Sequence, residues 1–126
     1  MADKRVEIVD EDGRITIAED VIASIARIAA EKVDGIAQSS GGVGGGLRSI
    51  FGGEDIAPNI KTELTEDTAR VELRIAVEYG YPVHEVAQGV QQNVQSDIEK
   101  MAGITVSSID VYVKKVVPPH THTSEG

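Results

Sequence analysis

Two runs of alternating residues constrain the fold of this chain more than any other feature. Residues 60–64 and 71–79 each alternate apolar with polar side chains, and a polar segment at 65–68 separates them. Such alternation is typical of two strands joined in a hairpin, with one face buried and the other solvated. Pairing Leu64 with Ala69 sets opposite charges across from each other on one face and mostly apolar groups on the other. The predicted cross-strand pairs are Glu63 with Arg70, Lys61 with Glu72, Thr62 with Val71 and Ile60 with Leu73.

Two further segments carry apolar residues at helical spacing instead. The first covers residues 19–33, with acidic residues at its start and Lys32 near its end, as the helix dipole favours, and it stops at Asp34-Gly35. The second covers residues 83–101. Each predicted helix has one apolar face, formed in the first by Val21, Ile22, Ile25, Ala26, Ile28, Ala29 and Val33 and in the second by Val83, Val86, Ala87, Val90, Val94, Ile98 and Met101.

Shorter strand signals complete the pattern. Residues 14–17 alternate, residues 36–38 could form a short strand, and residues 104–113 form a last strand whose inward-facing set changes phase across 107–108. That phase change predicts a β-bulge. The order of elements predicts an α/β (α+β) fold, a two-layer sandwich in which a mostly antiparallel sheet carries two helices on one face.

The length of 126 residues suits a single domain, which we place at residues 13–115. Residues 1–12 are highly charged and are predicted to be a flexible N-terminus. Residues 39–53 are rich in glycine and are predicted to be a loop. Residues 116–126, with two prolines and two histidines, are predicted to be a disordered tail.

The net charge of −9 disfavours two classes of partner. Nucleic acid is bound largely through Lys and Arg contacts to phosphate, and anionic membrane surfaces attract basic segments. The chain has no cysteine, which fits a reducing compartment, and it shows neither a signal peptide nor an apolar run of the roughly 20 residues that would span a bilayer. We therefore expect a cytoplasmic protein that reaches a membrane only through a partner.

No arrangement of residues predicts catalysis. His84, His120 and His122 lack the further ligands or nucleophile partners that a metal site or a catalytic triad needs. Neighbouring residues of a strand or helix point apart, so adjacent carboxylates do not form an acid–base pair. Such pairs are Glu19-Asp20, Glu54-Asp55 and Glu66-Asp67. The sequence predicts no catalytic residue, no metal ligand and no cofactor.

The glycine run leaves one alternative open. Residues 41–49 partly match the sequence motif of a phosphate-binding loop, but Leu47 occupies the position where that motif needs lysine. The same run contains the G-x-x-G pattern of KH domains, without the basic charge that clamps a nucleic-acid backbone. The alternative function is therefore an accessory domain that binds a ligand or nucleic acid through the loop 41–53.

Surface residues are the remaining candidates for function. The polar side of the second helix carries a stripe of glutamines, which offer both hydrogen-bond donors and acceptors to a protein partner. These candidate partner-binding residues are Gln88, Gln91, Gln92 and Gln95. Exposed strand edges are the second candidate, with Lys114 and Lys115 as guards against unwanted pairing at the end of the last strand.

Three segments in this order resemble the alkaline shock protein 23 family. They are GRITIAEDVI at 13–22 with Ile25-Ala26 and VDGI at 33–36, then VEYGYPVHEVAQGVQ at 77–91, then MAGITV at 101–106 with IDVYV at 109–113. The resemblance implies a non-enzymatic envelope stress response protein of Gram-positive bacteria. It also implies a cytoplasmic scaffold that self-associates and gathers beneath the membrane by binding a small membrane-anchored partner. The family offers no catalytic residues to carry over to this chain.

Overall fold

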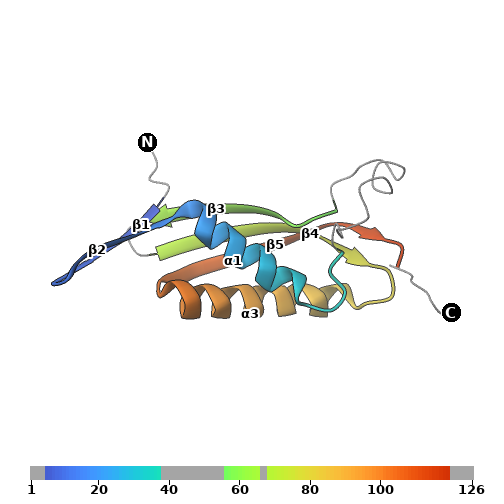
Figure 1. Ribbon diagram of the computed structural model, residues 1–126. Coiled ribbons are helices and arrows are strands. Elements are labelled where there is room, and N and C mark those ends of the chain that lie inside the picture. The colour runs from blue at the N-terminus through green and yellow to red at the C-terminus, as the bar shows by residue number, and fades with distance from the viewer. Residues whose placement is uncertain (1–4, 38–55, 66–67, 120–126) are drawn as a thin grey trace.

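The computed structural model of the protein describes residues 5–37, 56–65 and 68–119 (Figure 1). Its elements are β1 (Arg5–Asp10), β2 (Gly13–Ala18), α1 (Glu19–Glu31), β3 (Asn59–Thr65), β4 (Thr68–Glu78), α3 (Val83–Ala102) and β5 (Thr105–Val117). Several features predicted from the sequence lie outside the described residues. They are the loop 39–53, the acidic pairs at 54–55 and 66–67, and the tail histidines His120 and His122.

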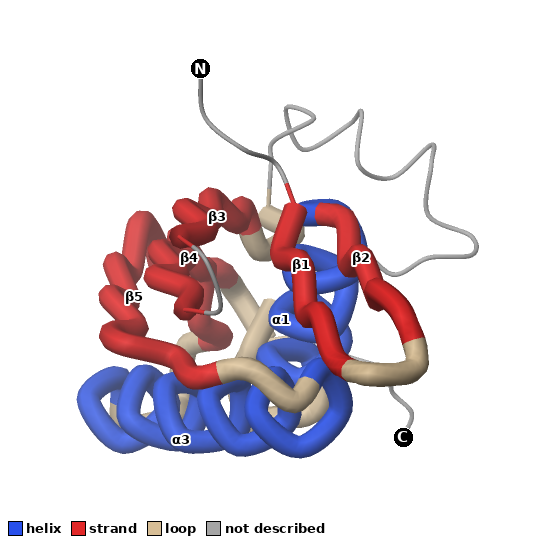
Figure 2. Tube along the Cα trace, turned by 90° about the vertical axis from the view of Figure 1, so that its left-hand side faces the viewer, coloured by secondary structure: helices blue, strands red, loops and turns tan. Residues whose placement is uncertain are grey.

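The main body has two layers. Strands β3, β4 and β5 form one sheet in that order, and α1 and α3 lie together against one of its faces (Figure 2). β3 and β4 are antiparallel, whereas β4 and β5 are parallel and are joined through α3. This arrangement confirms the predicted α+β sandwich with two helices on one face. The main sheet is mixed and not mostly antiparallel as predicted, because the chain returns through α3 and β5 lies parallel to β4.

The core between the layers is aliphatic. Its largest fully buried side chains include Ile22 from α1, Leu73 and Ile75 from β4, and Val90 and Ile98 from α3. In the part of the chain that the structure describes, no polar or charged residue is buried. Burial of such aliphatic side chains contributes roughly 1.5–3 kcal/mol each, so these contacts are the main force that holds the two layers together.

The predicted hairpin is confirmed in its register. β3 pairs with β4 so that Leu64 lies opposite Ala69, and Arg70 lies opposite Glu63 with Nη1 and Oε1 at 3.5 Å. The predicted bulge is also confirmed, because the pairing of β4 with β5 skips Ser107 between two consecutive residues of β4. The alternation of apolar and polar residues in β3 and β4 decides the register of the hairpin, since a slip of one residue would turn the apolar side chains of one strand into solvent.

The prediction of a flexible N-terminus over 1–12 is wrong for residues 5–10. These residues form β1, which pairs with β2 over six residue pairs from Arg5–Ala18 to Asp10–Gly13. The two strands form a separate ribbon that stands out from one end of the body (Figure 1), and we call this ribbon the arm. Residues 5–8 alternate charged with apolar residues, which is a short strand pattern that the high charge of the segment concealed.

Two other boundaries differ from the predictions. β5 continues to Val117, where its carbonyl accepts a hydrogen bond from the Tyr79 N–H at 2.8 Å, so residues 116–117 belong to the domain and not to the tail. The short strand predicted at 36–38 is reduced to a single bridge between Ile36 and Val77. Gly35 precedes that bridge with φ +98°, and its carbonyl accepts a hydrogen bond from the Glu78 N–H.

Candidate interaction surfaces

The predicted glutamine stripe lies on the exposed side of α3. Gln88, Gln91, Gln92 and Gln95 are all exposed. Gln91 has a structural role, because its Nε2 donates a hydrogen bond to the carbonyl of Ile109 on β5 at 2.9 Å. Gln92 and Gln95 border a shallow depression with Glu99 and Lys100. The stripe is therefore divided between one residue that holds α3 to the sheet and others that face solvent.

Side chains of α3 bond two backbone groups of β5, at Val106 and at Ile109. Besides the bond from Gln91, the Oε2 of Glu99 accepts a hydrogen bond from the Val106 N–H at 3.0 Å. Two backbone groups of this edge strand are thus bonded by side chains of α3, which makes this part of the edge a poor template for another strand. Further along β5, Lys114 Nζ donates to the carbonyl of Ala57 at 3.4 Å, so Lys114 reaches back over the sheet.

The face of the sheet opposite the helices is polar. Lys61, Glu63, Arg70, Glu72 and Asp110 surround a shallow hollow of about 210 Å³. Near one end of this face, the guanidinium of Arg74 lies 5.1 Å from the centre of the Tyr112 ring. Between β3 and β4 acidic groups lie opposite basic ones, Glu63 opposite Arg70 and Lys61 opposite Glu72, whereas between β4 and β5 Glu72 lies opposite Asp110. The charges of this face therefore compensate one another only along the β3–β4 pair.

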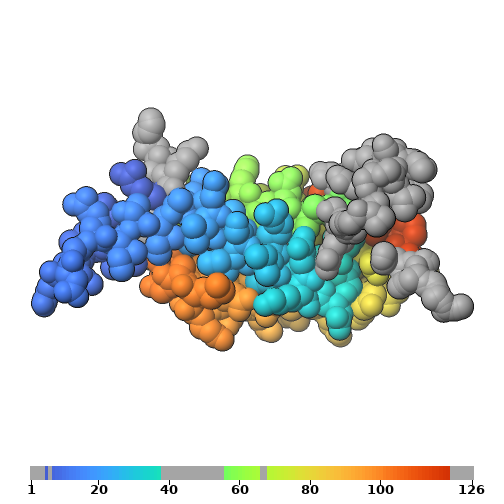
Figure 3. Space-filling model, in the orientation of Figure 1, coloured from blue at the N-terminus to red at the C-terminus, as the bar shows by residue number. Residues whose placement is uncertain are grey.

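Large apolar side chains are exposed on the arm, at the two helices and at the other end of the molecule. On the arm, Val9 and Ile15 are 67% and 56% exposed, and at the helices Ile28 and Met101 are 55% and 69% exposed. At the other end of the molecule, Tyr79 is 71% exposed. Figure 3 shows the arm, in dark blue, with open space on both sides. Groups of exposed apolar residues are typical of protein interaction sites.

Four exposed residues correct the predicted apolar faces of the helices. The periodicity predicts that Val21 and Ile28 of α1, and Val83 and Met101 of α3, belong to the buried faces, but all four are exposed. Each helix packs against the sheet and against the other helix over an arc narrower than its apolar stripe. The sequence shows which residues of each helix are apolar. The packing of the two helices decides which of these apolar residues remain exposed.

The remaining predicted residues form no cluster. His84 is exposed near the start of α3. Within the described ranges, no three His, Cys, Asp or Glu side chains come together as metal ligands would. Within the same ranges, no helix combines the length and the apolarity needed to cross a bilayer.

These elements and surfaces define a small two-layer α+β domain. The domain is similar to two solved structures of the MamM CTD. One, the D249N form, has a TM-score of 0.52 at 16% identity, with 77% of this chain and 92% of that chain covered. The other, comprising residues 215–293, has a TM-score of 0.50 at 17% identity, with 77% and 98% covered. At this level of identity the likeness shows the fold alone.

The chain belongs to the alkaline shock protein 23 family, which is described by a cell envelope-related function, and the match to the family model covers residues 7–118. The resemblance found in the sequence is thereby confirmed. Among its relatives are two uncharacterized proteins of Bacillus subtilis. YqhY is 30% identical over 101 residues, which cover 80% of this chain and 75% of YqhY, and YloU is 29% identical over 113 residues, which cover 88% and 94%.

Proposed function

We propose that this protein is a non-enzymatic interaction module of the cell envelope stress response. It self-associates and is held at the membrane by a small membrane-anchored protein. The observation that carries this proposal is the set of exposed apolar side chains on the arm and on the two helices, around a body whose core is already complete. Membership of a family with a cell envelope-related function supports the same proposal.

The apolar exposure argues for protein partners because it has a cost in a monomer. A domain of this size with a complete aliphatic core has no need of Val9, Ile15, Ile28 and Met101 at its surface. Exposed apolar groups gain roughly 25 cal/mol per Å² when another protein covers them. Where such groups lie together in one patch, an interaction surface is the usual reason for retaining them.

The charge of the protein argues for an adaptor at the membrane. With a net charge of −9, the chain is repelled by the anionic lipids that attract basic proteins. An anchored protein partner removes this difficulty, since recognition then depends on the partner's cytoplasmic segment and not on lipid. In this proposal the protein is cytoplasmic and lies beneath the membrane.

A vesicle experiment tests recruitment. The purified chain is sedimented with liposomes containing phosphatidylglycerol, and separately with inverted membrane vesicles from a Gram-positive bacterium that carries this protein. We expect no binding to the liposomes and saturable binding to the native vesicles that is lost when the vesicles are first treated with protease. Equal binding to both, or binding that survives protease, would contradict the adaptor.

Deletion of Gly41–Gly46 separates the proposal from the loop-binding alternative. The deleted chain should bind the native vesicles as the full chain does, because the surfaces that carry the proposal lie outside this segment. Loss of binding in a chain that still unfolds cooperatively would instead favour a binding role for the loop 41–53.

A further inference from the structure

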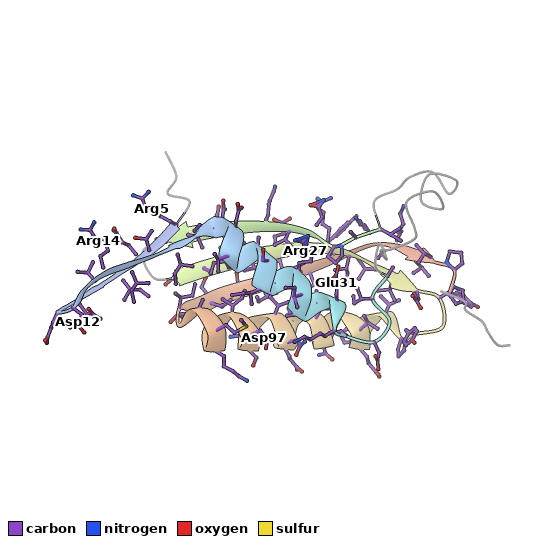
Figure 4. All side chains as sticks on the ribbon, viewed as in Figure 1. Arg5, Asp12, Arg14, Arg27, Glu31 and Asp97 are labelled. Carbon is purple, nitrogen blue, oxygen red and sulfur yellow. The ribbon has the colours of Figure 1, made fainter. Side chains whose placement is uncertain are left out.

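The arm has two different faces. Side chains alternate across a strand, and the pairing of β1 with β2 puts Ile8 and Ile15 on one face of the ribbon and Val9 and Arg14 on the other. Figure 4 shows Arg5 and Arg14 pointing to the side away from α3. The face that carries Ile15 is therefore turned to the side on which α3 lies. Near the base of the arm, Ile8 and Ile17 pack against the core, but Ile15 extends beyond it and is mostly exposed.

A second apolar strip runs along the seam between α1 and α3. Asn93 Nδ2 donates to the carbonyl of Ala29 at 2.8 Å, and Gly89 lies close to Val33. A step of one turn forward along α1 therefore corresponds to a step of one turn back along α3, so the two helices are antiparallel. Met101 lies about two turns beyond Asn93 on α3, so the same alignment places it next to the start of α1. Val21 and Ile28 lie two turns apart on the same side of α1, and Lys32 follows one turn after Ile28.

We call the apolar residues Val21, Ile28 and Met101 along the α1–α3 seam the seam strip. The arm and the seam strip start from the same point and run in opposite directions. α1 begins directly after β2, with Ala18 as its N-cap, and Figure 1 shows the arm extending to one side of this junction and α1 to the other. β2 has six residues and α1 has thirteen. At rises of about 3.3 Å and 1.5 Å per residue, both are about 20 Å long.

We propose that two copies of this chain form a dimer by laying each arm along the α1–α3 seam of the other copy. This proposal rests on the self-association proposed above and specifies the surface. A two-fold axis near the junction of β2 and α1 carries the arm of one copy over the seam of its partner and, by symmetry, the reverse. One reciprocal contact then covers the exposed apolar residues of both elements, which are Ile15, Val21, Ile28 and Met101.

The apolar residues of the arm and of α1 lie at compatible distances from the junction of β2 and α1. Counted from Ala18, Ile15 lies about 10 Å out along the arm, whereas Val21 and Ile28 lie about 4 Å and 15 Å along α1. The Ile15 side chain of one copy therefore falls between Val21 and Ile28 of the other. This is a contact of aliphatic groups that are exposed in the single chain.

The charges at the far ends of the arm and of the seam strip are opposite in sign. The arm ends in the acidic turn Asp10-Glu11-Asp12, about 20 Å from the junction, and the seam strip ends in the exposed Lys32 at about the same distance. The arm thus presents apolar and then acidic groups to a strip that presents apolar and then basic groups. A second copy supplies both complementary elements at once, which is the reason for choosing it as the occupant.

Sedimentation velocity over a concentration series tests the proposal on the full chain. Ile15→Glu and Ile28→Glu each place a charge in the contact and should raise the dimer dissociation constant about tenfold or more. Val9→Glu is the matched control, because Val9 lies on the opposite face of the same arm and is 67% exposed against 56% for Ile15. It should leave the constant unchanged. Circular dichroism verifies that each variant is folded, since all three positions are exposed.

Disulfide trapping gives an independent measurement, because the natural chain has no cysteine. Mixed Ile15→Cys and Ile28→Cys chains should form a crosslinked heterodimer on oxidation, in higher yield than mixed Val9→Cys and Ile28→Cys chains. Equal yields overturn the proposed contact.

The outcomes of sedimentation separate the two proposals. A wild-type chain that remains monomeric at every concentration overturns both the dimer and the proposed self-association. A chain that self-associates regardless of Ile15→Glu and Ile28→Glu overturns only the arm contact. A Val9→Glu chain that dissociates as readily as Ile15→Glu overturns the assignment of faces.

Discussion

Gly35 is the position where a single methyl group should destabilise the domain most. Its φ of +98° is rare for residues with a side chain, and a Cβ there would lie 2.8 Å from Cγ of Tyr81 and 2.9 Å from Cγ2 of Val86. Gly80 offers a matched control with φ +108° and no atom within 4 Å of its Cβ position. The two substitutions to alanine therefore share the backbone strain and differ in the clash.

Backbone strain acts at both positions, and the steric clash adds a second cost at Gly35. Holding a non-glycine residue at such a φ costs about 1–3 kcal/mol, and overpacking a core contact costs about 1–3 kcal/mol more. Tyr81 is partly exposed and can shift, but Val86 is buried in the core and cannot move without disturbing its neighbours. The gain from restricting the unfolded chain, about 0.4–1 kcal/mol, is common to both variants and cancels in their difference. We expect Gly35→Ala to lose about 2–5 kcal/mol and Gly80→Ala about 1–2 kcal/mol.

Urea unfolding followed by far-ultraviolet circular dichroism measures both losses. With a slope of about 2 kcal/mol/M, Gly35→Ala should lower the midpoint by about 1–2.5 M and Gly80→Ala by about 0.5–1 M. Adding Tyr81→Ala to Gly35→Ala removes one side of the clash, so the double variant should lose less than the sum of the two single losses. Equal losses for Gly35→Ala and Gly80→Ala would refute the packing argument and leave only backbone strain.

Three further substitutions test the core, the helix seam and the open sheet face. Leu73→Ala, at a side chain with no exposed surface, should lose about 2–5 kcal/mol in urea unfolding, and a loss under about 1 kcal/mol would contradict its place in the core. Asn93→Ala removes the side-chain hydrogen bond from α3 to the Ala29 carbonyl, which keeps its bond from the Lys32 N–H at 3.3 Å, and should lose about 0.5–1.5 kcal/mol, accompanied by faster amide exchange in α1. Arg70→Gln breaks an exposed ion pair with Glu63 and should change the melting temperature very little, with any difference vanishing in about 1 M salt.

The candidate surfaces are harder to predict than the fold. The glutamine stripe does lie on the outside of α3, but nothing in the sequence indicates that Gln91 bonds to the Ile109 carbonyl, because the two residues are 18 positions apart. Val21, Ile28 and Met101 fit the apolar periodicity of their helices as well as the buried residues do. Their exposure follows from the crossing of α1 and α3, which periodicity does not specify.

The sequence alone determined the elements whose patterns are local and self-consistent. The β3–β4 register follows from period-two alternation joined to complementary charges, because any other register buries charge or exposes the apolar set. The bulge at Ser107 follows in the same way from a change of phase within one strand.

Only the tertiary structure decided where the N-terminal ribbon goes. Local alternation can make β1 and β2 a hairpin, but it does not say whether that hairpin joins the edge of the main sheet or projects from the body. Contacts between elements far apart in sequence make that choice, through the base of the arm packing against the core while its outer part remains uncovered. Exposure of Ile15 and of the α1–α3 seam is therefore a property of the assembled domain, since it depends on which surfaces the other elements leave free.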